Sequence, residues 1–135
     1  MSNRIQRGRI VWVRLGPRGD WKLRPAVVLH DVPDPKPDSL IRLVGGTTAF
    51  TKPLSENEIP LPFHPPPNPH PLTKLKTETI VACDWIVEVE NSQIELLGGF
   101  VPGSALFRIF ERIAILFGTR DPQSIPVTPI DEQDL

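Results

Sequence analysis

Two short stretches of the sequence carry residue types that can hold a phosphate group. Arg24 stands directly before Pro25, which disfavours helical backbone for the arginine and so restricts the direction of its side chain. Further along, an apolar run ends in "GGTT", where Thr47 and Thr48 supply hydroxyl groups. A bound phosphodiester needs charge compensation and hydrogen bonds, which arginine and hydroxyl groups provide. A turn with capped threonines would explain "GGTT" equally well.

Positive charge is concentrated at the start of the chain. The sequence of 135 residues has a formal net charge of −1, which excludes a uniformly basic nucleic-acid-binding protein. Residues 1–30 nevertheless hold seven Lys or Arg and one acid, Asp20, a net charge of +6, so that the rest has −7. We predict an anion-binding surface at this end, and solvated strand ends are the alternative. The candidate contacts with an anionic strand are Arg14, Arg18, Trp21 and Lys22 in this segment, together with Thr48 and Lys52 further along the chain.

Other reactive residue types give weaker signals. Cys83 is the single cysteine and lies in an apolar run, which indicates a buried, inert thiol and excludes a disulfide framework. His64 and His70 lie in a Pro-rich loop without further ligands, so we expect neither a metal nor a cofactor. No apolar run approaches the roughly 20 residues of a membrane span, and the N-terminus lacks the apolar core of a signal peptide. We therefore expect a cytoplasmic protein.

Short strands must position the candidate residues. Runs rich in Val and Ile, bounded by Gly and Pro, predict strands at 10–15, 26–30, 40–44, 79–89 and 93–97. The 17 prolines are more than twice the usual share, and most of them gather in two segments. Proline lacks an N–H group, so residues 32–38 and 53–71 are predicted to be surface loops.

One helix is expected after the strands. The stretch "GSALFRIFERIAILFG" repeats apolar residues at helical spacing, which predicts a helix from Ser104, as N-cap, to Phe117, ended by Gly118. This helix is apolar around much of its circumference, so we expect a second subunit to cover part of it. Residues 1–118 are predicted to form one domain, a mainly β, small curled barrel with this C-terminal helix. Residues 119–135 are expected to form a flexible, acidic, Pro-rich tail.

Three blocks, in this order, resemble the MazF/PemK family of toxin ribonucleases. "RGRIVWVRLGP" followed by "RPAVVL" resembles the opening of the family pattern. "GGTTAFTK" is similar to the family's Thr-Ser strand end with its downstream Lys, and "VACDWIVEVENSQI" to the strand that normally contains Asp-Gln-Ile-Arg. The resemblance covers roughly residues 5–117. Residues 85–87 replace Gln-Ile-Arg, so a basic residue of the family pattern is missing.

The resemblance implies a toxin of a toxin–antitoxin system with an SH3-like barrel (MazF/CcdB-like) that forms a homodimer. Its activity would be metal-independent cleavage of single-stranded RNA, with Arg24 and Thr47 as the catalytic pair and a cognate antitoxin that blocks the groove. The RNA's own 2′-OH would be the nucleophile. An arginine is a poor general base because it stays protonated, so the acceptor of the 2′-OH proton is left open. Two alternatives also stay open: an inactive toxin-like module that binds RNA or protein, and a CcdB-like topoisomerase poison.

Overall fold

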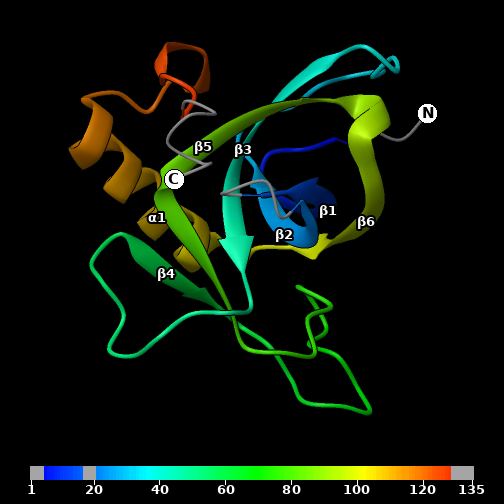
Figure 1. Ribbon diagram of the computed structural model, residues 1–135, viewed down its shortest axis with the longest axis vertical. Helices are drawn as coiled ribbons and strands as arrows, with labels where there is room; N and C mark the ends of the chain where they lie inside the picture. Colours follow the sequence, from blue (N-terminus) through cyan, green and yellow to red (C-terminus); the bar gives the residue numbers. More distant parts are fainter. Residues whose placement is uncertain (1–4, 17–20, 129–135) are drawn as a thin grey trace.

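The computed structural model of the chain is mainly β and is built on one antiparallel sheet (Figure 1). It describes residues 5–16 and 21–128. Six strands pair in the order β4-β5-β3-β2-β1-β6, and the helix α1 follows them in the chain. The elements are β1 (Arg9–Leu15), β2 (Lys22–Val28), β3 (Leu40–Thr47), β4 (Glu58–Leu61), β5 (Thr79–Glu90), β6 (Ile94–Phe100), α1 (Gly103–Phe117) and two 3-10 turns, η2 (Asn91–Gln93) and η3 (Pro122–Ser124).

The sheet is curled but not closed into a ring. Strands β4 and β6 form its two edges, and the described residues show no pairing between these two strands. The loop before β5 covers the outer edge of β6, because Phe100 N donates to Leu72 O at 2.8 Å and Gly99 N donates to Thr73 O at 3.3 Å. A Cβ atom at Gly99 would lie 1.9 Å from Leu72 O, so only glycine permits this approach. The predicted fold class is confirmed, with this open sheet in place of a fully closed barrel.

Both faces of the sheet are apolar, which gives the protein two core clusters. One cluster lies between the sheet and α1, where Ile109 and Ile113 of the helix pack against Val27 and Val44. The other lies on the opposite face and includes Ala26, with the residues Val11, Val13, Val28, Leu43 and Val87. Successive side chains of a strand point to opposite faces, so continuous Val and Ile runs fill both clusters.

Two details differ from the sequence-based prediction. The Pro-rich loop 53–71 contains the strand β4, which the sequence did not predict. Pro60 is tolerated there because β4 is an edge strand, bonded only to β5. The helix begins at Gly103 after Pro102 and has no side-chain cap, so the assignment of Ser104 as N-cap is wrong. Its predicted end is confirmed, since Gly118 adopts the left-handed conformation with φ 74°.

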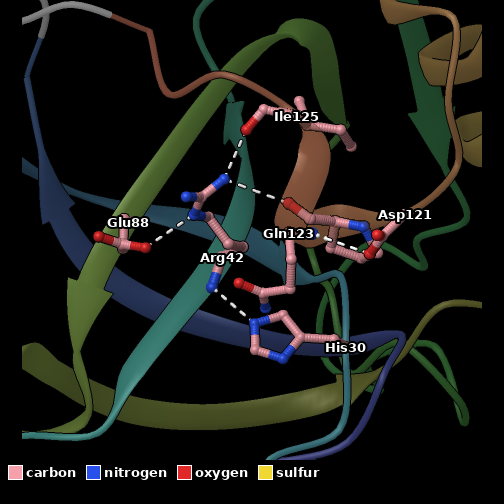
Figure 2. A network of polar contacts seen from close by, with 7 residues as sticks. His30, Arg42, Glu88, Asp121, Gln123 and Ile125 are labelled. Carbon is pink, nitrogen blue, oxygen red and sulfur yellow. Dashed lines mark hydrogen bonds and ion pairs between the residues drawn. The ribbon is translucent and has the colours of Figure 1, made fainter.

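The chain beyond Gly118 packs against β3 and β5 (Figure 2). Ile125 is 1% exposed and belongs to the helix-side core. Arg42 of β3 donates through Nη1 to the carbonyl oxygens of Pro122 and Ile125, and through Nε to Glu88 Oε2 at 2.7 Å. Residues 119–128 are therefore bound to the sheet, unlike the flexible tail expected from the sequence, and residues 129–135 lie outside the described part. No helix in the described ranges is both long and apolar enough to cross a membrane.

Candidate active site

Arg24 and Thr47 contact each other at the end of the sheet. Arg24 Nη1 donates to Thr47 Oγ1 at 3.1 Å, and Arg24 Nε donates to Leu15 O at 3.0 Å. The threonine hydroxyl is held in turn by Ala49, whose N–H donates to Oγ1 at 3.0 Å and whose carbonyl oxygen accepts from it at 3.3 Å. A guanidinium group and a hydroxyl group from different strands are thus fixed side by side. Their proposed catalytic role stays a prediction.

Pro25 explains why this contact forms here. It lies in β2 and pairs with Trp12 of β1, but the β2–β3 pairing starts only at Ala26. Since proline has no N–H group for a second ladder, the pairing of β2 with β3 ends at this residue. Arg24 lies just beyond the end of this ladder, and its side chain contacts Thr47, the last residue of β3. Pro25 therefore determines the position of the Arg24 side chain by ending the β2–β3 ladder next to it.

Trp85 is a site residue that the sequence analysis did not assign. The pairing of β3 with β5 passes from Val44–Ile86 directly to Gly46–Val81, so the intervening residues of β5 bulge opposite Gly45. The bulge places the Trp85 ring over Gly45, where a Cβ atom would lie 2.5 Å from the ring. The Arg24 guanidinium carbon lies 5.9 Å from the centroid of the same ring. In the sequence, the two adjacent glycines of "GGTT" indicate such a close approach.

The indole of Trp85 has an unusual environment. Its Nε1 atom is buried and has no hydrogen-bond partner among the residues that the structure describes. A buried polar group without a partner is costly, so the ring is held in place by packing rather than by hydrogen bonding. The ring therefore forms an apolar wall beside the charged and polar groups of Arg24 and Thr47.

The predicted RNA contacts fall into three groups. Trp21 is 49% exposed, and Lys22 and Thr48 are exposed as well, so all three are accessible to a ligand. Two cations are ion-paired on the surface, since Arg14 Nε lies 2.8 Å from Glu95 Oε2 and Lys52 Nζ lies 2.8 Å from Glu78 Oε2. Exposed ion pairs are weak, about 0–1 kcal/mol, so a phosphate can replace the carboxylate. Arg18 lies outside the described residues. The RNA-binding roles remain predictions.

Two other arginines of the basic N-terminal segment pack on aromatic rings. The guanidinium carbon of Arg7 lies 4.2 Å from the centroid of Phe110, and that of Arg9 lies 4.7 Å from the centroid of Phe100. Arg9 Nε also donates to the carbonyl oxygen of Gly98 at 3.1 Å. These two basic residues therefore attach the start of the chain to α1 and to β6 by cation–π contacts.

The remaining reactive residue types have structural surroundings. Cys83 is fully buried, and this burial, followed by the negative charge of Asp84, raises the pKa of its thiol to about 12. Such a thiol is not a nucleophile at neutral pH. His70 Nδ1 accepts hydrogen bonds from the backbone N–H groups of Leu72 and Thr73. The centroid of its ring lies 4.7 Å from that of His64. In the part of the chain that the structure covers, no cluster of three or more His, Cys, Asp or Glu could hold a metal ion.

Comparison with solved structures defines the fold class. The MazF toxin of Deinococcus radiodurans is 19% identical, with a TM-score of 0.63 over 84% of this chain and 96% of that chain. A MazF toxin of Mycobacterium tuberculosis is 18% identical, with a TM-score of 0.57 over 82% and 96%. A mycobacterial endoribonuclease, solved in complex with its cognate antitoxin, is 14% identical, with a TM-score of 0.57 over 84% and 94%.

These neighbours share the curled antiparallel sheet and C-terminal helix of this protein nearly over their whole length. No protein-family model matches the sequence, and no curated protein matches it. The chain thus belongs to the class of small mainly β proteins with one C-terminal helix. Within that class, it has the fold of the MazF toxins, which confirms the sequence resemblance at the level of the fold.

Proposed function

We propose that the protein is the toxin of a toxin–antitoxin system and a metal-independent endoribonuclease that cleaves single-stranded RNA. One observation carries the proposal: the Arg24 guanidinium and the Thr47 hydroxyl, 23 residues apart in sequence, meet at 3.1 Å at the end of the sheet. The fold of the MazF toxins supports it, and so does the mycobacterial neighbour, which is an endoribonuclease.

The proposed reaction uses the RNA's own 2′-oxygen as the nucleophile. The 2′-oxygen bonds to the adjacent phosphorus, the bond from phosphorus to the 5′-oxygen breaks, and a 2′,3′-cyclic phosphate remains. One proton leaves the 2′-oxygen and one reaches the 5′-oxygen. DNA lacks the 2′-OH, so it is bound without being cut.

In this reaction Arg24 stabilises the negative charge that grows on the phosphate oxygens. Its side chain is oriented before the substrate binds, because Leu15 O and Thr47 Oγ1 hold two of its N–H groups. Preorganised donors of this kind lower the barrier because they need no reorientation during the reaction. Thr47 positions a phosphate oxygen or the 2′-OH, and its hydroxyl exchanges its bonds to Ala49 for the substrate.

The proposed partners are an antitoxin and a second copy of the chain. Neighbouring structures are MazE–MazF complexes and an endoribonuclease with its cognate antitoxin, which supports an antitoxin as a partner here. Phe107 and Ile115 lie two turns apart on one side of α1 and are 56% and 65% exposed. Exposed apolar side chains grouped in this way are typical of an interface, which supports a homodimer. Sedimentation at micromolar concentration should therefore show a dimer.

The function is tested by expression of the protein together with sequencing of RNA ends. Induction should arrest growth, and the purified protein should cut a single-stranded RNA in EDTA and leave a cyclic phosphate. The same strand with 2′-O-methyl groups should stay intact. Growth arrest without RNA cleavage would instead favour a poison of a protein target, and absence of both effects would favour an inactive binding module.

A further inference from the structure

A pocket at the same end of the sheet as the candidate active site, but on the opposite face, is not used by the proposed chemistry. Its volume is about 240 Å³, and it is lined by Trp12, Thr48, Lys74, Leu75, Lys76, Thr77 and Thr79. The pocket opens on the helix-side face of the sheet, where Trp12 and Leu75 pack on the core that contains Val27. Arg24 and Thr47 point to the opposite face, because successive side chains of a strand alternate. Both sites lie at the same end of the sheet, and Thr48 follows Thr47 in the chain, so a single strand of RNA held at the pair can reach the pocket around this end.

The wall of the pocket that carries the two lysines is fixed before any ligand binds. Thr73 is buried, and its Oγ1 donates to Pro62 O at 2.7 Å and accepts from Leu75 N at 3.2 Å. The backbone of Leu72 and Thr73 is bonded to β6 at Gly99 and Phe100. Lys74 is held with φ 63°, a left-handed conformation that is rare outside glycine. Such a backbone persists only where the surroundings enforce it, so the pocket is preorganised.

The chemistry of the lining favours a nucleotide. Lys74 and Lys76 are exposed, and neither makes a salt bridge in the described part of the structure, so both can pair with phosphate. The Trp12 ring offers a surface on which a base can stack, and Thr48 and Thr77 offer hydroxyl groups. The volume is below the about 300 Å³ at which pockets for whole small ligands begin. One residue of a longer chain fits this size better than a free metabolite does.

We propose that this pocket is a nucleotide subsite, which binds the base and phosphate next to the phosphodiester held by Arg24 and Thr47. The inference rests on the proposed function, because the ligand is the same single strand of RNA. It also gives the Pro-rich connection between β4 and β5 a role: the connection extends the binding surface of the sheet end with two cations. Trp12 supplies stacking, while Lys74 and Lys76 neutralise the neighbouring phosphates.

Binding of a short 2′-O-methyl RNA, which cannot be cleaved, tests the two cations by fluorescence anisotropy across a salt series. Lys76→Ala and Lys74→Gly each remove one charge, and glycine tolerates the left-handed backbone at position 74. Lys36→Ala is the matched control, since Lys36 is exposed in the 32–38 loop and does not line the pocket. Each pocket variant should bind several-fold more weakly and lower the salt slope by about 0.7, whereas the control should match wild type.

Oligonucleotides with a single abasic position test the stacking on Trp12. Against wild type, one abasic position should reduce affinity by about tenfold, in the range of the loss of a base–aromatic stack. In Trp12→Leu this position should no longer matter, and Trp12→Phe should retain the effect in part. Trp12 packs partly on the core, so Trp12→Leu is used only if its circular dichroism matches wild type. The lysine variants provide the test independently of this residue.

The outcomes separate the subsite from the proposed function. If wild type cuts RNA and the pocket variants bind like Lys36→Ala, the subsite is wrong while the function stands. If wild type cuts no RNA but Lys74→Gly and Lys76→Ala weaken binding with a lower salt slope, the subsite stands and the nuclease proposal fails. An abasic effect that persists unchanged in Trp12→Leu would contradict stacking in this pocket.

Discussion

Two arginines on neighbouring strands, Arg24 of β2 and Arg42 of β3, show how differently the same side chain is used at the two ends of the sheet. Arg42 joins segments that are distant in sequence, with an ion pair to Glu88 and hydrogen bonds to carbonyl oxygens 80 and 83 residues away (Figure 2). Its side chain is only 16% exposed. The contacts described for Arg24 are to a carbonyl and to a hydroxyl at the end of the sheet, from Leu15 and Thr47.

The difference lies in what surrounds each strand end. Beside Arg42 the chain returns after α1, and Thr128 N donates to Ile86 O at 2.8 Å, so this corner is closed by the chain itself. Beside Arg24 the ladder between β2 and β3 ends at Pro25, and a pocket with two exposed lysines lies at the same end of the sheet. A closed corner converts an arginine into a structural crosslink. At the other end of the sheet, the same side chain holds the carbonyl of Leu15 and the hydroxyl of Thr47.

The largest expected effect comes from the removal of Arg24. Arg24→Ala should lower the RNA cleavage rate by at least about 100-fold, because loss of one preorganised donor costs that much. The free energy of unfolding should fall by about 2 kcal/mol, at about 1 kcal/mol for each of the two hydrogen bonds described for Arg24. Cleavage assays and urea denaturation measure the two quantities. Lys36→Ala is the control, an exposed cation in the 32–38 loop that belongs to neither the pair nor the predicted RNA contacts. Full cleavage by both Arg24→Ala and Thr47→Ala would contradict the assigned pair.

Removal of Arg42 should have the opposite effect to removal of Arg24: it should lower the stability strongly and leave RNA cleavage nearly unchanged. Arg42→Met retains the apolar part of the side chain but leaves Glu88 and two carbonyl oxygens without their donor. We expect a loss of about 3 kcal/mol in the free energy of unfolding, from several hydrogen bonds to a charged group. RNA cleavage should stay near wild type at temperatures where the variant is folded. Glu88→Gln, which keeps both carbonyl contacts, should lose less. Equal stability of Arg42→Met and wild type would contradict the crosslink.

The sequence predicts the parts of this comparison that depend on local patterns. Val and Ile runs between Gly and Pro located five of the six strands, and Gly118 located the end of the helix. Arg24 and Thr47 were singled out by residue type and by the neighbouring Pro and Gly, and they lie in contact. The strand β4 was missed because Pro60 argues against a central strand, whereas β4 is an edge.

The missing parts depend on contacts that no local pattern contains. Trp85 meets Gly45 only because β5 bulges between its pairs with Val44 and Gly46. In the sequence Arg42 is an ordinary strand residue, and only the contacts with the chain after α1 show that it is a crosslink. Long-range register and chain return decide both positions, so they appear only in three dimensions.

The contact between Trp85 and Gly45 sharpens the comparison at the Arg24 end of the sheet. In Gly45→Ala the new Cβ atom would lie 2.5 Å from the ring, so the indole must move. Overpacking of this kind costs about 2 kcal/mol of stability, and the displaced ring lies 5.9 Å from the Arg24 guanidinium carbon. Cleavage should therefore fall as well. Gly103→Ala is the control, because its Cβ atom would have no neighbour within 4 Å. Identical activity and stability of the two variants would show that the ring position is unimportant.

The smallest expected effect concerns Cys83, a reactive residue type on the closed side of the molecule. Its thiol lies in the helix-side core, and burial raises its pKa from 9.0 to about 12. The native state therefore keeps the proton to higher pH than the unfolded state does. The protonated thiol of Cys83 contributes fully to the free energy of unfolding below pH 9. This contribution is lost as the pH rises from 9 towards 12, with a limiting slope of about 1.4 kcal/mol per pH unit. Cys83→Ala lacks the titrating group, so the difference between its stability and that of wild type should change by about 1 kcal/mol between pH 9 and 10, where the unfolded-state thiol passes from half to almost fully ionised. Urea denaturation at both pH values measures this change. Rapid reaction of the native thiol with a disulfide reagent at pH 8 would show instead that Cys83 is accessible, and that this side of the molecule is more open than its packing indicates.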